Sequence, residues 1–162
     1  MRNPPIRVFR PMIERKIPMY HVALVRDEGV PYQTEPVVVS TPEHVAAMCA
    51  DLRGLDREAF EVICCSTKNI VLARVNVSIG SLNTSIVHPR EVFKAAIVAN
   101  AASVILVHNH PSGDPTPSAA DCSLVRRLSR AGEQLGIEVL DSVVLGGGDT
   151  TALCSMRELG ML

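Results

Sequence analysis

Apolar and polar residues follow one another along this chain at spacings that predict several strands. Residues 59–65 and 70–78 are predicted to form a hairpin, because turn-forming residues separate the two and the second segment alternates apolar and polar positions. This alternation puts Val71, Ala73, Val75 and Val77 on one face. Residues 104–107 are a continuous apolar run, which is typical of a strand buried on both faces. Residues 137–145 predict a further strand, which a run of glycines ends.

Helices are predicted between and before these strands. Residues 41–52 combine a Thr-Pro helix start with a helix-forming segment. A second helix begins at Pro89 and has apolar residues along one side. Residues 118–135 form an amphipathic helix that Gly136 is placed to end. Strands and helices in this order predict a layered α/β fold.

The chain is predicted to have two parts. Residues 1–52 would form an N-terminal extension with short strands at 20–25 and 37–39 and one helix, and residues 53–162 would form the catalytic domain. The length of 162 residues suits one domain with a modest extension. Residues 20–39 could add an edge strand to a second copy, which would make a homodimer.

Composition narrows the class of protein. The formal net charge is −1, so the chain has no overall electrostatic footprint for nucleic acid. The five cysteines are odd in number and lack a disulfide-framework spacing, which favours reduced thiols in a cytosolic protein. The sequence shows no signal-peptide pattern and no run of about 18 apolar residues. We therefore expect a cytoplasmic protein that does not enter the membrane.

Two histidines and an aspartate form a candidate metal site. His108 and His110 follow the buried run 104–107, and residues i and i+2 of extended backbone point to the same side. Pro111 favours that extended geometry in the residue before it. Asp121, in the first turn of the next helix, can reach the same place. Three nitrogen and oxygen ligands with one open position are typical of a catalytic zinc site, and one zinc ion per chain is expected.

The same residues admit a second interpretation. Ser118 and Asp121 are spaced as a capping box, which stabilises a helix start without any metal. Because one carboxylate cannot serve fully as both cap and ligand, we assign Asp121 to the metal and leave Ser118 for the cap or for catalysis. A hydrolytic zinc site also needs a carboxylate that moves a proton to the leaving group. Spacing alone leaves these candidates: Glu58, Glu61, Glu91, Asp114 and Asp141.

Residues 87–92, 108–121 and 140–141 resemble the RadC-like branch of the Jab/MPN family. The pattern H-x-H-P-x6-S-x2-D within them is that superfamily's JAMM metallopeptidase motif. The resemblance covers roughly residues 50–162. It implies a mixed β-sheet sandwiched by helices, as in cytidine-deaminase-like folds. It also implies zinc-dependent cleavage of peptide or isopeptide bonds, with a peptide or protein as the substrate.

The resemblance also implies a role for single residues. The positions that match the family's zinc ligands are His108, His110 and Asp121. Ser118 would donate a hydrogen bond to the oxyanion of the tetrahedral intermediate. Segment 57–62 resembles the one that carries the general base, and Glu58 occupies that place, with Glu61 as the alternative. These two glutamates are three positions apart and face opposite sides of a strand, so only one can point at the metal. Glu91 and Asp141 are interpreted as structural.

Two departures from the family pattern stand out. Full-length RadC proteins carry a helix-hairpin-helix domain before this core, which an extension of residues 1–52 is too short to hold and whose G-x-G turns it lacks. This departure weakens a role in DNA binding. The family usually has a histidine directly after the aspartate that Asp141 matches, and Ser142 stands there instead, which would alter the support of a metal ligand.

Two other functions remain as hypotheses. A RadC-type accessory protein of DNA repair or mobile elements could hold the metal in a structural or non-peptidase site. Its binding to DNA would then depend steeply on salt. The third hypothesis is a nuclease, because residues 108–110 spell His-Asn-His. In HNH endonucleases, however, the three residues are dispersed over a ββα unit and are not consecutive.

Overall fold

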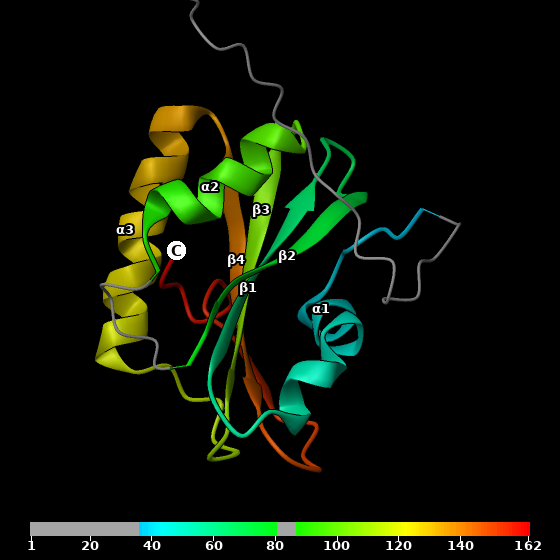
Figure 1. The fold of residues 1–162 in the computed structure, drawn as a ribbon, viewed down its shortest axis with the longest axis vertical. Helices are drawn as coiled ribbons and strands as arrows, with labels where there is room; N and C mark the ends of the chain where they lie inside the picture. Colours follow the sequence, from blue (N-terminus) through cyan, green and yellow to red (C-terminus); the bar gives the residue numbers. More distant parts are fainter. Residues whose placement is uncertain (1–35, 81–86) are drawn as a thin grey trace, which may run out of the picture.

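The computed structural model describes residues 36–80 and 87–162, which form a five-stranded sheet with helices on both faces (Figure 1). The strands lie in the order β2-β1-β3-β4-β5. Their bounds are β1 Ala59–Cys65, β2 Val71–Ile79, β3 Ser103–His110, β4 Glu138–Gly146 and β5 Leu153–Ser155. Strands β3 and β4 are parallel, while the other neighbouring pairs of this sheet are antiparallel.

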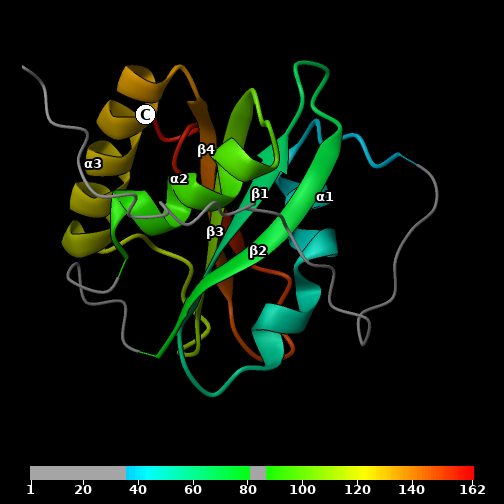
Figure 2. The same cartoon turned by 45° about the horizontal axis from the view of Figure 1, so that its top comes forward.

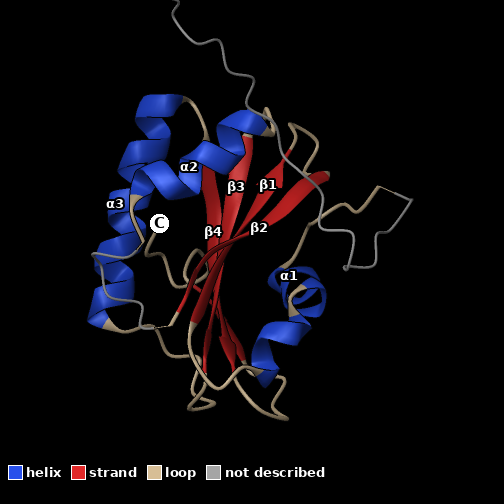
Figure 3. Ribbon diagram, viewed as in Figure 1, coloured by secondary structure: helices blue, strands red, loops and turns tan. Residues whose placement is uncertain are grey.

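The helices cover the sheet as two outer layers. Helix α1 (Pro42–Met48) and the short 3-10 helix η1 (Ala50–Gly54) lie on one face, and α2 (Pro89–Val98) and α3 (Ala119–Leu135) lie on the other. Figures 1 and 2 show both layers, and Figure 3 separates helix from strand by colour. The predicted mixed sheet sandwiched by helices is therefore confirmed.

Local sequence explains where the helices begin and end. Thr41 accepts a hydrogen bond from the backbone N–H of His44, and the His88 imidazole accepts one from the N–H of Arg90. A proline occupies the first turn of both helices, where its missing N–H has no intrahelical partner to lose. Gly136 ends α3 in the left-handed conformation, with φ 69°.

Alternation along the central strands divides the buried residues into two cores. On the face of α2 and α3, β1 and β3 bury Phe60, Val62 and Leu106. On the face of α1, the same strands bury Ile63 and Val107. Strand β3 is buried on both faces, as predicted, but it continues to His110 and does not end at residue 107. Both histidines of the motif are therefore fixed by the ladder of the sheet.

One detail of the predicted hairpin is wrong. Val71 was expected to share a face with the apolar residues that follow it in β2, but it packs against the core on the α1 side. The pairing of β1 with β2 shifts between Cys64 and Cys65, whose partners are Ala73 and Val71. The extra residue in β2 reverses the alternation at that point.

The part of the predicted extension that the structure describes packs on the sheet. Val45, Cys49 and Leu52 are buried in the core on the α1 side, and the predicted boundary at residue 53 falls inside η1. The strand predicted at residues 20–25 lies outside the described residues, and the division into two parts stays a prediction.

The structure also describes the five cysteines and the apolar character of the helices. All five cysteines are unpaired, as expected of reduced thiols. Within residues 36–80 and 87–162, no helix has both the length and the apolar character that crossing a bilayer requires.

Candidate metal centre

His108, His110 and Asp121, called the ligand cluster from here on, converge where the end of β3 meets the start of α3. The Nε2 atoms of the two imidazoles lie 3.2 Å apart. One carboxylate oxygen of Asp121 lies 3.6 Å from Nε2 of His108, and the other lies 3.5 Å from Nε2 of His110. The structure thus brings together the three residues that the spacing predicts, and both imidazoles do face one point.

The spacing of these atoms fits a small, tetrahedrally bound ion. Bonds of about 2.0–2.1 Å in a tetrahedron separate neighbouring ligand atoms by about 3.3 Å, whereas an octahedron of the same size separates them by about 2.9 Å. The two Nε2 atoms, 3.2 Å apart, lie nearer the tetrahedral value, and each imidazole has an oxygen of Asp121 within 3.6 Å. Two imidazoles and one carboxylate would then fill three vertices and leave the fourth for a water or a substrate.

The loop after β3 fixes the orientation of His110. Its Nδ1 lies 2.9 Å from the carbonyl oxygen of Asp114. Because a carbonyl can only accept, Nδ1 carries the proton and Nε2 keeps its lone pair for a metal. The carbonyl of His110 accepts hydrogen bonds from Gly113 and Gly147, at 3.0 and 2.8 Å. A Cβ on Gly147 would lie only 2.9 Å from that carbonyl oxygen, so this close contact requires glycine.

His108 is held by packing. Its side chain is 1% exposed, and its ring stacks on Phe60 with centroids 6.0 Å apart. Its Nδ1 atom has no hydrogen-bond partner within the described residues. Ser142, which stands where the family resemblance expects histidine, is fully buried on the neighbouring strand β4. The Oγ atom of Ser142 also has no partner in the described part of the chain.

Asp121 belongs to the ligand cluster and to a complete capping box at once. Its Oδ2 accepts hydrogen bonds from the backbone N–H and the hydroxyl of Ser118, at 2.7 and 2.6 Å, and its own N–H donates to Ser118 Oγ at 3.1 Å. The sequence assigned Asp121 to the metal and left Ser118 for the cap or for catalysis; in the structure Asp121 completes the cap and also faces both imidazoles, and its role as a metal ligand stays a prediction. A carboxylate has enough lone pairs for several partners, and its Oδ1 faces His108. Burial opposes ionisation, but the neighbouring His108 imidazole and the hydrogen bonds from Ser118 outweigh it and hold the pKa of Asp121 below its usual value.

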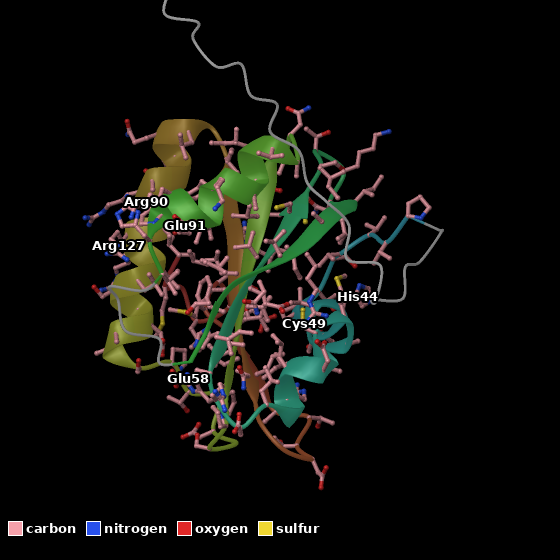
Figure 4. The ribbon with its side chains drawn as sticks, viewed as in Figure 1. His44, Cys49, Glu58, Arg90, Glu91 and Arg127 are labelled. Atoms are coloured by element: carbon pink, nitrogen blue, oxygen red, sulfur yellow. The ribbon has the colours of Figure 1, made fainter. Side chains whose placement is uncertain are left out.

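Glu58 lies at the end of the sheet that holds the ligand cluster. It directly precedes β1, and its carbonyl accepts a hydrogen bond from Gly80 at 2.8 Å. Figure 4 shows Glu58 at this end of the molecule. The pairing of β1 with β3 ends at Phe60 and His108, and the same register continued by two residues sets Glu58 opposite His110. An open pocket of about 390 Å³ is lined by Asp56, Arg57, Glu58, Gly80 and Pro111.

Glu61 points to the other face of the sheet. It is 7% exposed and pairs with Arg74, which also donates to Asp51 at 2.8 Å and to the carbonyl of Met48 at 2.9 Å. We call Glu61, Arg74 and Asp51 the ion-pair cluster. Burial lowers the pKa of Arg74, but its hydrogen bonds to Asp51 and Glu61 outweigh this effect and raise it. Glu61 is therefore directed toward the α1 side and away from the ligand cluster, as expected if only one of the two glutamates can point at the metal.

The remaining carboxylates have structural partners. Glu91 is partly exposed near the start of α2 and pairs with Lys94 at 2.8 Å, and Figure 4 places it well away from Glu58. Asp141 accepts hydrogen bonds from the Ser155 hydroxyl and from the backbone of Arg157, which ties β4 to the end of the chain. Asp114 is exposed and accepts a hydrogen bond from the backbone N–H of Thr116 within the loop after β3.

Sequence reasoning missed Asn109. Its side chain is completely buried and contacts the backbone directly before β1. The available signal was its place between two histidines that share a face of the strand. A polar side chain at such a position must find partners elsewhere, because a buried amide without hydrogen bonds is costly.

Comparison with known proteins gives a consistent picture. The family model described as the RadC-like JAB domain matches residues 39–161. A UPF0758 protein of Desulforamulus reducens is 54% identical over 128 residues, which cover 78% of this chain and 56% of that protein. A UPF0758 protein of Desulfitobacterium hafniense is 51% identical over 126 residues, which cover 77% and 54%. Another, from Moorella thermoacetica, is 55% identical over 117 residues, which cover 72% and 51%. The chain spans about half the length of these curated relatives, whose names state no activity.

Proposed function

The chain belongs to the RadC-like JAB domain family, and from this premise we propose that it is a zinc-dependent hydrolase of peptide or isopeptide bonds. The observation that carries the proposal is the convergence of His108, His110 and Asp121 on one place, with the two Nε2 atoms 3.2 Å apart. The coarser conclusion, a buried group that could hold a metal ion, comes from the geometry. The choice of zinc and the reaction are the proposal.

The ligand cluster would hold one zinc ion through Nε2 of His108, Nε2 of His110 and a carboxylate oxygen of Asp121. Zinc in such a site acts as a Lewis acid and lowers the pKa of water to about 7. In the neutral His110 imidazole, the Nδ1 proton that is donated to the Asp114 carbonyl leaves the lone pair on Nε2 for this purpose. The buried Phe60 ring, which stacks on the His108 imidazole, excludes bulk solvent from one side of the site.

Glu58 is proposed as the general base and acid. Its carboxylate would accept a proton from the attacking water and pass it to the leaving nitrogen, which would otherwise depart as an unstable anion. Its position beside the open pocket and opposite His110 in register supports this role. Peptide and isopeptide bonds both have an amide nitrogen as leaving group, so the same two proton transfers would serve either bond.

Ser118 is proposed to donate to the oxyanion that forms on the attacked carbonyl. A hydroxyl has one proton, and in this structure it goes to Oδ2 of Asp121. The role therefore requires the hydroxyl to rotate toward the substrate during the reaction. The backbone N–H of Ser118 keeps its own bond to Asp121, so the helix start stays capped while the hydroxyl moves.

The proposal includes the setting and the partner. The open pocket beside Glu58 suits part of a peptide or protein chain, because it is exposed and its rim carries charged side chains of both signs, Asp56 and Arg57. The five unpaired thiols fit a reducing compartment, so the proposed location is the cytoplasm.

Metal analysis combined with one substitution tests the proposal. The purified protein is expected to hold about one zinc per chain, and Glu58→Gln is expected to keep the zinc while losing roughly 10²–10⁴ of the hydrolytic rate. The rate is measured with a pool of fluorogenic peptides and a fluorogenic isopeptide-linked lysine probe. Glu61→Gln is the matched control: it removes the same charge from the other face and is expected to keep the rate wherever the variant is folded.

Two results would contradict the proposal in different ways. If the purified protein holds no zinc, the proposed metal site is wrong. Zinc at full occupancy, with Glu58→Gln as fast as the wild type, would remove Glu58 as the base and leave the metal in place.

A further inference from the structure

The Asn109 side chain holds the backbone on both sides of Glu58. Its Oδ1 accepts a hydrogen bond from the N–H of Ala59 at 2.7 Å, and its Nδ2 donates to the carbonyl of Arg57 at 3.1 Å. The orientation of this amide is unambiguous, because one partner can only donate and the other can only accept. Asn109 thus spans the peptide groups before and after Glu58.

Asn109 stands in β3 directly between two residues of the ligand cluster. It lies between His108 and His110, whose imidazoles point together to one side of the strand. Successive side chains of a strand point to opposite faces, so the pleat that directs both imidazoles to the ligand cluster directs Asn109 away from it. One short segment therefore supplies two ligands of the cluster and also holds the backbone of the proposed base.

We infer that Asn109 is a positioning residue that fixes the Glu58 carboxylate relative to the ligand cluster. This inference rests on the proposed function and deepens it. The carbonyl of Glu58 is held from the opposite side by the N–H of Gly80, so the Glu58 backbone is anchored toward both β2 and β3. With the backbone anchored, the carboxylate has only its own side-chain torsions left to search, and fewer of its positions are unproductive for proton transfer.

Other side chains would not replace Asn109. Aspartate has the same shape and could still accept from Ala59, but it would set a carboxylate oxygen against the carbonyl of Arg57 with no donor between them. Alanine would leave both backbone groups without their partner. Serine is too short to reach two peptide groups that flank a residue. The series Asn109→Asp, Asn109→Ser and Asn109→Ala therefore removes one or both contacts in graded steps.

The first arm of the test does not depend on activity. The ¹³Cδ signal of the Glu58 carboxylate is followed by NMR while zinc is added to the 162-residue chain, with Glu58→Gln identifying the signal. We expect zinc to shift this signal in the wild type and to shift it by less than half as much in Asn109→Ala and Asn109→Asp, at unchanged zinc content. An equal shift in the variants would overturn the inference.

The second arm measures hydrolysis of the fluorogenic probes. Asn109→Ala is expected to lower kcat about 10- to 100-fold, with KM changed less than twofold, because misplacement of a catalytic group by about 1 Å has an effect of this size. The double variant Asn109→Ala/Glu58→Gln is expected to be no slower than Glu58→Gln alone. Non-additivity of this kind shows that Asn109 acts through Glu58.

A control variant on the α1 side of β1 separates a loss of stability from a loss of positioning. Ile63→Val removes one buried methyl group, and its effect on the rate is expected to be less than twofold, although it also destabilises the fold. All rates are compared well below the melting temperature of the least stable variant. If Asn109→Ala unfolds, Asn109→Asp and Asn109→Ser carry the test.

The two proposals fail in different ways. A wild-type protein that binds zinc but hydrolyses no probe overturns the proposed reaction, and the NMR arm then decides the inference. A wild-type protein that binds no zinc overturns both. An active wild type with Asn109→Ala equally fast, or with the double variant much slower than Glu58→Gln, overturns the role of Asn109 alone.

Discussion

Two groups of polar side chains lie on opposite faces of the same central strands, and they differ in how their charges are matched. The ion-pair cluster on the α1 side contains its own cation, since Arg74 meets Glu61 and Asp51 directly. The ligand cluster on the α3 side contains two imidazoles and a carboxylate whose metal-binding atoms all face one another.

The difference separates a cluster that neutralises its own charge from one that could hold a metal ion. Burial of a charge is costly unless a partner compensates it, and Arg74 provides that compensation for Glu61 within the fold. The ligand cluster has no such cation of its own among its three residues, and the Nε2 atoms of its two imidazoles lie 3.2 Å apart. Burial alone therefore does not distinguish the two clusters, whereas the kind of side chain that each brings together does.

The largest effect is expected from removing one ligand. His110→Ala is expected to lower the zinc affinity by more than the roughly 10–100-fold typical of losing a residue that only supports a ligand. Zinc content after dialysis, measured by mass spectrometry, checks this. His44→Ala is the matched control, because His44 lies on α1, on the opposite face of the sheet from α3, and Figure 4 shows it well apart from Glu58. Full zinc content in His110→Ala would break the contrast between the clusters.

The next effect belongs to the ion-pair cluster. Arg74→Met leaves Glu61 buried without its cation and is expected to lower the free energy of unfolding by about 3 kcal/mol. Zinc content should stay unchanged in the folded variant. The double variant Arg74→Met/Glu61→Leu is expected to recover most of the loss, because it removes the uncompensated charge as well. Chemical denaturation measures the stability, and a loss of zinc would contradict the separation of the two clusters.

The smallest effect concerns a thiol beside the ion-pair cluster. Burial raises the pKa of Cys49 to about 12, against the opposing influence of Arg74. The folded protein keeps this proton while the unfolded chain releases it above about pH 9, so stability is complete below pH 9 and falls as the pH rises from about 9 to 12. Near pH 10.5 the loss from Cys49 is about 2 kcal/mol.

Denaturation at pH 8 and at pH 10.5 checks this pH dependence. Cys49→Ala loses some stability at both values, because it opens a small cavity, but it should show a smaller drop between them than the wild type. Cys64 and Cys65, whose pKa values burial raises to about 11, keep part of the alkaline drop in that variant. An equal drop in both proteins would mean that Cys49 ionises as freely when folded as when unfolded.

The sequence predicted the parts of the site that depend on local geometry. The i, i+2 spacing of His108 and His110 and the helix start at Ser118 are short-range features, and both are found in the structure. The same applies to the buried strand, the amphipathic helix and its glycine end.

The parts that depend on pairing between distant segments could not be predicted. Alternation shows which side chains of a strand share a face, but it does not give the partner strand or the register. The register of β1 against β3 sets Phe60 beside His108 and so decides where Glu58 lies. The hydrogen bonds from Arg53 to the carbonyls of Gly146 and Ala152 bridge almost a hundred residues and have no local pattern either.

The double duty of Asp121 affects how related sequences should be compared. Selection for a well-formed helix would by itself preserve Ser118 and Asp121, since they cap α3 whether or not an ion is present. A relative that had lost the proposed metal site would therefore still display the second half of the motif. His110, which is partly exposed and carries no such helix role, would be among the first positions to drift. In a survey of genomes, this histidine is the better marker of a retained metal site.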